Sequence, residues 1–208
     1  MLAIIDYGVG NLFSLKSSLD AIGESCFVSR DAAEIRRADR IILPGVGAFG
    51  DAAKKLEESG MAELVKELAG IGKPILGICL GMQLLFDRSY EDGVYAGLGL
   101  IHGEIRPIAD VIPKDYKIPH IGWNQLQFPG EKNPLFQSIQ SGDFVYFVHS
   151  YYGVDCAEST IAVTEYGAPL TAAVAQGNIL GCQFHPEKSG KTGLAILKAF
   201  CKMGGERA

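Results

Sequence analysis

The segment of residues 73–86 constrains the fold more strongly than any other part of the chain. Residues 74–78 are apolar, as a strand that is buried on both faces requires, and Cys79 follows them directly. Leucines then recur at the i, i+4 and i+5 positions of a helix: Leu80, Leu84 and Leu85. The pattern predicts a strand, a sharp turn at Cys79 and a helix.

Cys79 lies between Gly77 and Gly81, so the turn reads Gly-x-Cys-x-Gly. This is the pattern of the Gly-x-Ser-x-Gly nucleophile elbow with sulfur in place of oxygen, and glycines let the chain segments pass closely. A helix N-terminus favours a thiolate, and the N–H of Leu80 can face a developing oxyanion. The alternative is a buried cysteine at the end of a core strand, because free cysteines are among the most buried residues.

Composition and charge narrow the class of protein. The 208 residues contain 48% hydrophobic and 21% charged residues and no Pro/Ser-rich linker, which predicts one α/β domain spanning residues 1–208. The net charge is −5 with scattered Lys and Arg, so we expect neither nucleic-acid nor membrane binding. An odd count of 5 cysteines without an apolar leader indicates reduced thiols and a cytoplasmic protein.

The first 90 residues alternate between strand and helix patterns. We expect strands at 2–5, 26–29 and 40–43, and helices that start near Asn11, at Asp31 and after Phe49, the last of them broken near Gly60. This order predicts a mostly parallel sheet covered by helices on both faces, with ligands beyond the carboxyl ends of the strands.

Short strands joined by hairpins are expected in the second half of the chain. The predicted strands are residues 100–105, 121–128, 144–148, 160–164, 172–175 and 179–184. Gly177-Asn178 is a tight-turn signal between the last two of them. The final helix is expected to bury one face made of Leu194, Leu197, Phe200 and Cys201.

A second loop is expected at the same edge of the sheet as the elbow. It is the Gly-rich segment 44–47, in which the N–H of Val46 or Gly47 can supply a second oxyanion donor. A plain strand-to-helix turn is the alternative, because Pro and Gly occur routinely in such turns.

The chain offers a general base at His185. Pro186 holds the residue before it in an extended conformation, and a two-residue period places Glu187 on the same side as His185. A carboxylate there can fix the imidazole tautomer, so the sequence predicts a Cys79-His185-Glu187 triad. A zinc site at Cys182 and His185 is the alternative, but their odd spacing sends them to opposite faces and no second ligand pair exists. We expect no metal and no cofactor, and structural roles for His120 and His149.

With residues 77–83 (GICLGMQ) and 185–187 (HPE) together, the chain resembles the class I (triad) glutamine amidotransferases over essentially its full length. Four more segments look like the glutaminase subunits of imidazole glycerol phosphate synthase in histidine biosynthesis: residues 6–12, 43–49, 121–124 and 149–151. The resemblance implies the three-layer α/β fold of that class, with a mostly parallel central sheet, helices on both faces and antiparallel hairpins in the C-terminal half.

The resemblance also implies an activity and its residues. Cys79 would attack the side-chain amide of L-glutamine, release ammonia and be freed when the glutamyl thioester is hydrolysed, with His185 moving the protons. The backbone at Val46 and Leu80 would form the oxyanion hole. The residues that match glutamine-binding positions are Gly47, Gln83, Glu91, Ser150 and Tyr151.

A partner is implied by the same resemblance. The ammonia would pass to a (β/α)₈ cyclase subunit, in a heterodimer that makes imidazole glycerol phosphate and AICAR. The positions implied to contact it are Asn11, Trp123 and Lys188, and the alternative for Asn11 and Lys188 is that they are solvated surface residues. Val46 departs from the Pro-Gly-Gly loop of most triad amidotransferases, and the glutaminase subunits share this replacement. A catalytically silent subunit and a stand-alone cysteine hydrolase of the same fold remain as alternatives.

Overall fold

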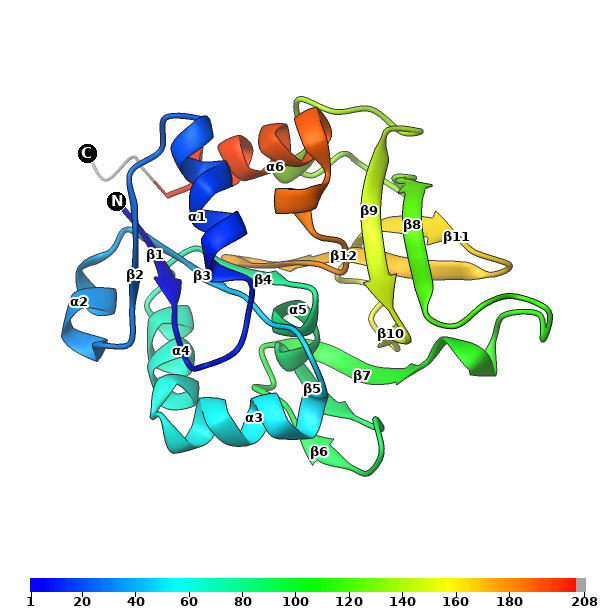
Figure 1. The fold of residues 1–208 in the computed structure, drawn as a ribbon, viewed down its shortest axis with the longest axis horizontal. Coiled ribbons are helices and arrows are strands. Elements are labelled where there is room, and N and C mark those ends of the chain that lie inside the picture. The colour runs from blue at the N-terminus through cyan, green and yellow to red at the C-terminus, as the bar shows by residue number, and fades with distance from the viewer. Residues whose placement is uncertain (205–208) are drawn as a thin grey trace.

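A seven-stranded sheet forms the centre of the protein in the computed structural model, which describes residues 1–204 (Figure 1). Its strand order is β11-β12-β13-β4-β3-β1-β2. The strands are β1 (Leu2–Ile5), β2 (Cys26–Ser29), β3 (Arg40–Leu43), β4 (Ile75–Ile78), β11 (Thr160–Glu165), β12 (Pro169–Gln176) and β13 (Ile179–Cys182). The pairs from β2 to β13 are parallel, and β12 and β11 are antiparallel to their neighbours.

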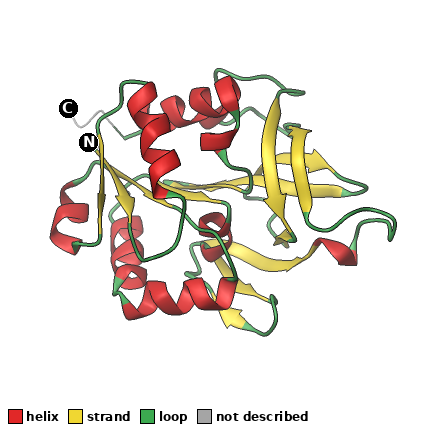
Figure 2. Cartoon of the chain, in the orientation of Figure 1, coloured by secondary structure: helices red, strands yellow, loops and turns green. Residues whose placement is uncertain are grey.

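Helices cover both faces of this sheet, as the helix and strand colours in Figure 2 make clear. The helices are α1 (Leu12–Ala21), α2 (Ala32–Arg37), α3 (Phe49–Glu58), α4 (Met61–Gly70), α5 (Leu80–Leu84) and α6 (Gly190–Lys202). Side chains of α1 and α6 pack on one face, and those of α2, α3 and α4 pack on the other. The result is the predicted three-layer α/β architecture.

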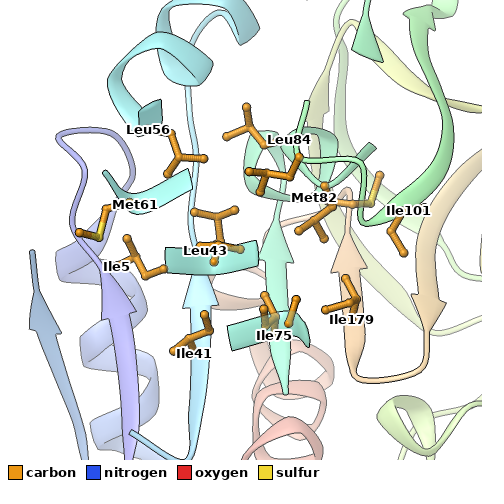
Figure 3. Packing of buried hydrophobic residues seen from close by; sticks show 14 of the residues in the cluster. Ile5, Ile41, Leu43, Leu56, Met61, Ile75, Met82, Leu84, Ile101 and Ile179 are labelled. Carbon is orange, nitrogen blue, oxygen red and sulfur yellow. The ribbon is translucent and has the colours of Figure 1, made fainter. Parts of the chain in front are cut away.

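Side chains alternate between the two faces along the central strands, and this alternation explains the two hydrophobic cores. In β1, Ile4 joins the core under α1 and α6, whereas Ile5 joins the core under α3 and α4. Figure 3 shows the second core, where Leu56 and Met61 lie above Leu43. Successive side chains of a strand point to opposite faces, so a continuous apolar run supplies both cores.

Two smaller sheets adjoin the central one. One has the order β10-β7-β5-β6, and the other pairs β8 with β9 in antiparallel register. Their strands are β5 (Phe86–Ser89), β6 (Tyr95–Ala96), β7 (Ile101–Pro107), β8 (His120–Gln125), β9 (Phe144–His149) and β10 (Tyr151–Val154). Short 3₁₀-helices occur as η1 (Ile108–Asp110), η2 (Pro134–Phe136) and η3 (Pro186–Lys188).

Most predicted elements are confirmed, including their caps. Asn11 accepts a hydrogen bond from the N–H of Ser14 at 3.3 Å, and Asp31 caps α2 through the N–H groups of Ala33 and Glu34. The Gly177-Asn178 turn joins β12 and β13 as predicted.

Some expectations about the elements are wrong. Strands β5, β6 and β10 were not predicted, and the strand expected at 179–184 ends at Cys182. The buried face of α6 centres on Ile196, Leu197 and Phe200, while Leu194 is only half-buried. Residues 205–208 of the predicted 1–208 domain lie outside the described residues. No helix within residues 1–204 combines the length and apolar character needed to cross a bilayer.

Candidate active site

The turn at Cys79 has the geometry of a nucleophile elbow. Strand β4 ends at Ile78, α5 begins at Leu80, and Cys79 between them has φ 54° and ψ −112°. A Cβ at Gly81 would lie 1.9 Å from the carbonyl oxygen of Leu43, and one at Gly77 would lie 2.6 Å from the carbonyl oxygen of Gly81. Both glycines are therefore required by close backbone approach, as the sequence predicted.

A pocket of about 260 Å³ opens over Cys79. Its lining comes from six parts of the chain: Val46 and Gly47; Cys79, Leu80 and Gln83; Glu91; Pro119; Val148, His149, Ser150 and Tyr151; and His185. Larger hollows lie elsewhere, such as one of about 490 Å³ beside α3 and α4. The pocket over Cys79 contains both the thiol of the elbow and the imidazole of His185, so it is the candidate for chemistry.

The sheet brings His185 to the same pocket. Strand β13 lies parallel to β4 with Cys182 opposite Ile78, and the N–H of Cys79 donates to the carbonyl of Cys182 at 2.7 Å. Three residues beyond Cys182, the N–H of His185 donates to the carbonyl of Tyr146 on β9 at 3.0 Å. The carboxyl ends of β4 and β13 therefore deliver Cys79 and His185 side by side.

Glu187 lies behind the imidazole rather than in the pocket. Its Oε1 is 2.8 Å from His185 Nδ1, and the two side chains are 4% and 3% exposed. The predicted contact is present, but the predicted cause is wrong. Pro186–Lys188 form a 3₁₀-helix and not a continued strand, so a tight turn brings Glu187 back to His185.

The surroundings of His185 favour the imidazolium form. Burial alone lowers its pKa, but interactions with Cys79 and Glu187 outweigh burial and raise the pKa to about 9. A positive imidazolium at neutral pH therefore lies beside the Cys79 thiol. The pair can supply a nucleophile and a proton donor at the same time.

The loop of residues 44–47 packs directly against the elbow. A Cβ at Gly45 would lie 2.6 Å from the backbone nitrogen of Gly81, and Tyr7 donates from its hydroxyl to the carbonyl of Pro44 at 2.8 Å. Gly47 has φ 96°, whereas Val46 is not among the described residues with positive φ. Val46 and Leu80, the expected oxyanion donors, thus lie on adjoining segments at the pocket.

The expected glutamine-binding residues all line the pocket. They are Gly47, Gln83, Glu91, Ser150 and Tyr151. The carboxylate of Glu91 accepts from the N–H of Phe49 at 2.8 Å; burial raises the pKa of Glu91, and this hydrogen bond opposes the rise.

Two groups at the site were not predicted. Gln183 is fully buried and lies 3.8 Å from the sulfur of Cys79 through its Nε2. His149, expected to be structural, lines the pocket and also contacts His120, with His120 Nδ1 and His149 Nε2 3.0 Å apart. Gln183 lies two residues before the HPE motif, but only the register of β13 against β4 places it beside Cys79.

Two of the expected partner-contact residues, Trp123 and Lys188, lie near one another at the surface. Trp123 is 54% exposed, and its ring meets that of Tyr146 edge-on with centroids 6.2 Å apart. The ammonium of Lys188 lies 6.0 Å from the same Tyr146 ring. Asn11 caps α1 and is half-buried. Within residues 1–204, no group of three or more His, Cys, Asp or Glu side chains is arranged to hold a metal ion.

In comparisons with known proteins, one family matches almost the whole chain. The model of the class-I glutamine amidotransferase family matches residues 3–203. Imidazole glycerol phosphate synthase subunit HisH of Bacillus cereus (strain G9842) is 51% identical over 201 residues, covering 96% of this chain and 93% of that protein. The HisH subunit of Caldanaerobacter subterraneus subsp. tengcongensis is 49% identical over 205 residues, covering 98% of each chain.

Solved structures share the fold at lower identity. A crystal structure of a glutamine amidotransferase matches with a TM-score of 0.75 and 18% identity, covering 98% of this chain and 99% of that one. PurLQS from Thermotoga maritima matches with a TM-score of 0.72 and 21% identity, covering 96% of each chain. The chain therefore belongs to the class I glutamine amidotransferases, among the HisH subunits of imidazole glycerol phosphate synthase.

Proposed function

We propose that this chain hydrolyses L-glutamine to glutamate and ammonia and passes the ammonia to a cyclase subunit in L-histidine biosynthesis. One observation carries the proposal: Cys79 at the elbow shares a pocket with His185, whose Nδ1 is 2.8 Å from buried Glu187. A nucleophile, an acid–base group and an orienting carboxylate are the parts that acyl transfer through a covalent intermediate requires. The pocket of about 260 Å³ suits a single amino acid better than a peptide.

The reaction proceeds in two halves. The Cys79 thiolate attacks the amide carbon of glutamine, and the carbonyl oxygen becomes an oxyanion. Protonated His185 gives its proton to the nitrogen, the C–N bond breaks and ammonia leaves a glutamyl thioester on Cys79. Neutral His185 then takes a proton from water, the hydroxide adds to the thioester, and glutamate departs as the C–S bond breaks.

Backbone and side-chain groups at the pocket have separate tasks in this proposal. The N–H groups of Leu80 and Val46 stabilise the oxyanion, which is the largest single contribution in many acyl-transfer enzymes. Gly47, Gln83, Glu91, Ser150 and Tyr151 hold the glutamine. The carboxylate of Glu91 is suited to its α-ammonium group.

The cyclase subunit is proposed as a (β/α)₈ barrel that covers the mouth of the pocket. Asn11, Trp123 and Lys188 are its proposed contacts, supported by the exposed aromatic surface of Trp123 beside Lys188 and Tyr146. Aromatic side chains such as Trp and Tyr are enriched at protein interfaces. The proposal also places the heterodimer in the cytoplasm.

Glutamine hydrolysis by triad variants tests the assignment. With the cyclase subunit and its phosphosugar ligand present, His185→Ala should lower the rate as far as Cys79→Ala does, because a triad acts as a unit. Glu187→Gln should retain more activity, because the imidazole remains but is poorly oriented. Glutamate release is measured for each variant against wild type. A Glu187→Gln rate below that of His185→Ala would refute the assigned roles, and a wild-type protein without glutaminase activity would refute the function.

A further inference from the structure

The buried amide of Gln183 joins two groups of the proposed active site. Its Nε2 is 3.8 Å from Cys79 Sγ, within reach of a long hydrogen bond to sulfur, and its Oε1 is 3.0 Å from Gln83 Nε2. Gln183 is 0% exposed, so no water competes for these contacts. An amide can be turned by 180°, and its orientation decides whether a donor or an acceptor faces the sulfur.

The backbone carbonyl of Tyr151 fixes that orientation. Gln83 Nε2 lies 3.3 Å from this oxygen, which can only accept, so the amide of Gln83 must present its nitrogen there. The same nitrogen contacts Gln183, and two N–H groups facing each other would repel. Gln183 must therefore present Oε1 to Gln83 and Nε2 to Cys79.

A second donor holds the Tyr151 carbonyl in place. His149 Nδ1 lies 2.8 Å from it and must carry a proton to make this contact. Burial lowers the pKa of His149 to about 3, so the ring is neutral and its Nε2 accepts from His120 Nδ1. Both lone pairs of the carbonyl are thus used, by His149 and by Gln83, and the orientation of Gln183 follows from an anchor that does not titrate near neutral pH.

We propose that Gln183 is a positioning residue that donates a hydrogen bond to the Cys79 thiolate and holds the amide of Gln83. The inference rests on the proposed function, because it assigns Gln183 to the same nucleophile. A fixed N–H donor stabilises an ionised acceptor more than a neutral one, so it raises the thiolate fraction at a given pH. The contribution adds to that of the His185 imidazolium.

Alkylation of Cys79 by iodoacetamide tests the proposal without depending on the substrate. Thiolates react and thiols do not, so the pH midpoint of alkylation reports ionisation. The readout is mass spectrometry of the peptide containing Cys79, with half-buried Cys26 as an internal control. In Gln183→Leu the Cys79 midpoint should rise by about one pH unit, a tenfold loss of thiolate below it, because a hydrogen bond to a charged group is lost.

A second variant separates the two contacts of Gln183. Gln183→Glu keeps an oxygen toward Gln83 but places a carboxylate beside the sulfur, so its midpoint should rise at least as much as that of Gln183→Leu. KM for glutamine should increase more in Gln183→Leu, which removes one of the two acceptors that hold Gln83 and leaves only the carbonyl of Tyr151. Exposed Gln176 on β12 provides a matched control, and Gln176→Leu should match wild type.

The outcomes decide between this inference and simpler roles. Unchanged alkylation midpoints of Cys79 in folded Gln183→Leu and Gln183→Glu would overturn the inference. Loss of the native circular dichroism spectrum in both variants would also overturn it, because a packing role would then explain why Gln183 is needed. Glutamine hydrolysis by the wild-type protein is measured in parallel. Its absence would refute the proposed function, whereas the alkylation midpoints would still judge Gln183.

Discussion

Cys79 holds a backbone conformation that side chains usually avoid. Its φ is 54°, and among the described non-glycine residues only Asp92 and Asp155 also have a positive φ. Such a conformation costs on the order of 1–3 kcal/mol. Gly77 and Gly81 meet backbone atoms so closely that no Cβ fits at either position. The strain therefore lies at the residue whose sulfur must project into the pocket, and the flanking glycines make the turn possible.

Val46 is the residue at which we expect basal activity to be restrained. We infer that the resting loop points the N–H of Val46 away from the oxyanion. Turning this N–H toward the oxyanion would require a large change of φ, and a positive φ costs a β-branched residue roughly 1–2 kcal/mol. Val46 does not have positive φ in this structure. We therefore predict that Val46→Gly raises glutaminase activity about tenfold when no phosphosugar ligand is present, measured as glutamate release.

A proline at the same position provides the opposite test. Val46→Pro has no N–H to offer, so stimulation by the ligand-bound partner should be lost, while synthesis from added ammonium salts should survive. Loss of one oxyanion donor corresponds to roughly 10²–10³ in rate. Basal activity of Val46→Gly at the wild-type level, in a folded protein, would mean that strain at Val46 does not restrain the enzyme.

At the scale of elements, the β8–β9 pair carries a buried histidine couple behind the pocket. His120 stacks on Phe147 and on Tyr166, with centroid distances of 4.9 and 4.0 Å, and contacts His149. Burial lowers the pKa of His120 to about 4 and that of His149 to about 3. Both rings are neutral in the folded protein at pH values where the unfolded chain binds protons.

This difference predicts acid destabilisation with a defined sign. Above pH 6.5 both histidines are neutral in the folded and in the unfolded chain, so they do not destabilise the fold. As the pH decreases from 6.5 toward the folded pKa values, the free energy of unfolding falls by about 1.4 kcal/mol per pH unit for each histidine. His120→Phe keeps an aromatic ring for stacking but removes one of the two imidazoles that bind a proton in the unfolded chain. Urea unfolding between pH 6.5 and 5 should give a shallower slope of stability against pH in this variant; equal slopes would contradict the account.

Elements could be predicted from the sequence where the residues that determine them are close together in the chain. The first strand and its helix follow from an apolar run and from Asn11, and the elbow follows from Gly77, Cys79 and Gly81. The strand β5 carries Asp87 and Arg88 and pairs in parallel with β7, so its apolar pattern is weak and its partner is distant in sequence. The 3₁₀-helix at Pro186 was mistaken for extended chain because proline restricts only the residue before it.

At the scale of the whole molecule, the site is made by the sheet. The parallel strands β13, β4 and β3 are neighbours in the sheet, and the segments that follow them bring His185, the elbow at Cys79 and the loop of Val46 to one pocket. The residues at short motifs could be predicted because each motif carries its own chemistry. Gln183 and the carbonyl of Tyr151 could not, because their importance comes from contacts between separate strands and not from their own sequence context.

We propose that Cys79 is needed only to liberate ammonia and that synthesis takes place on the partner subunit. The most direct measurement compares glutamine-dependent with ammonia-dependent synthesis of imidazole glycerol phosphate by the complex containing Cys79→Ala. Glutamine-dependent synthesis should fall to background, because no thioester can form, while synthesis from ammonium salts should match that of the wild-type complex. Glutamine-dependent synthesis at the wild-type rate in Cys79→Ala would contradict the account.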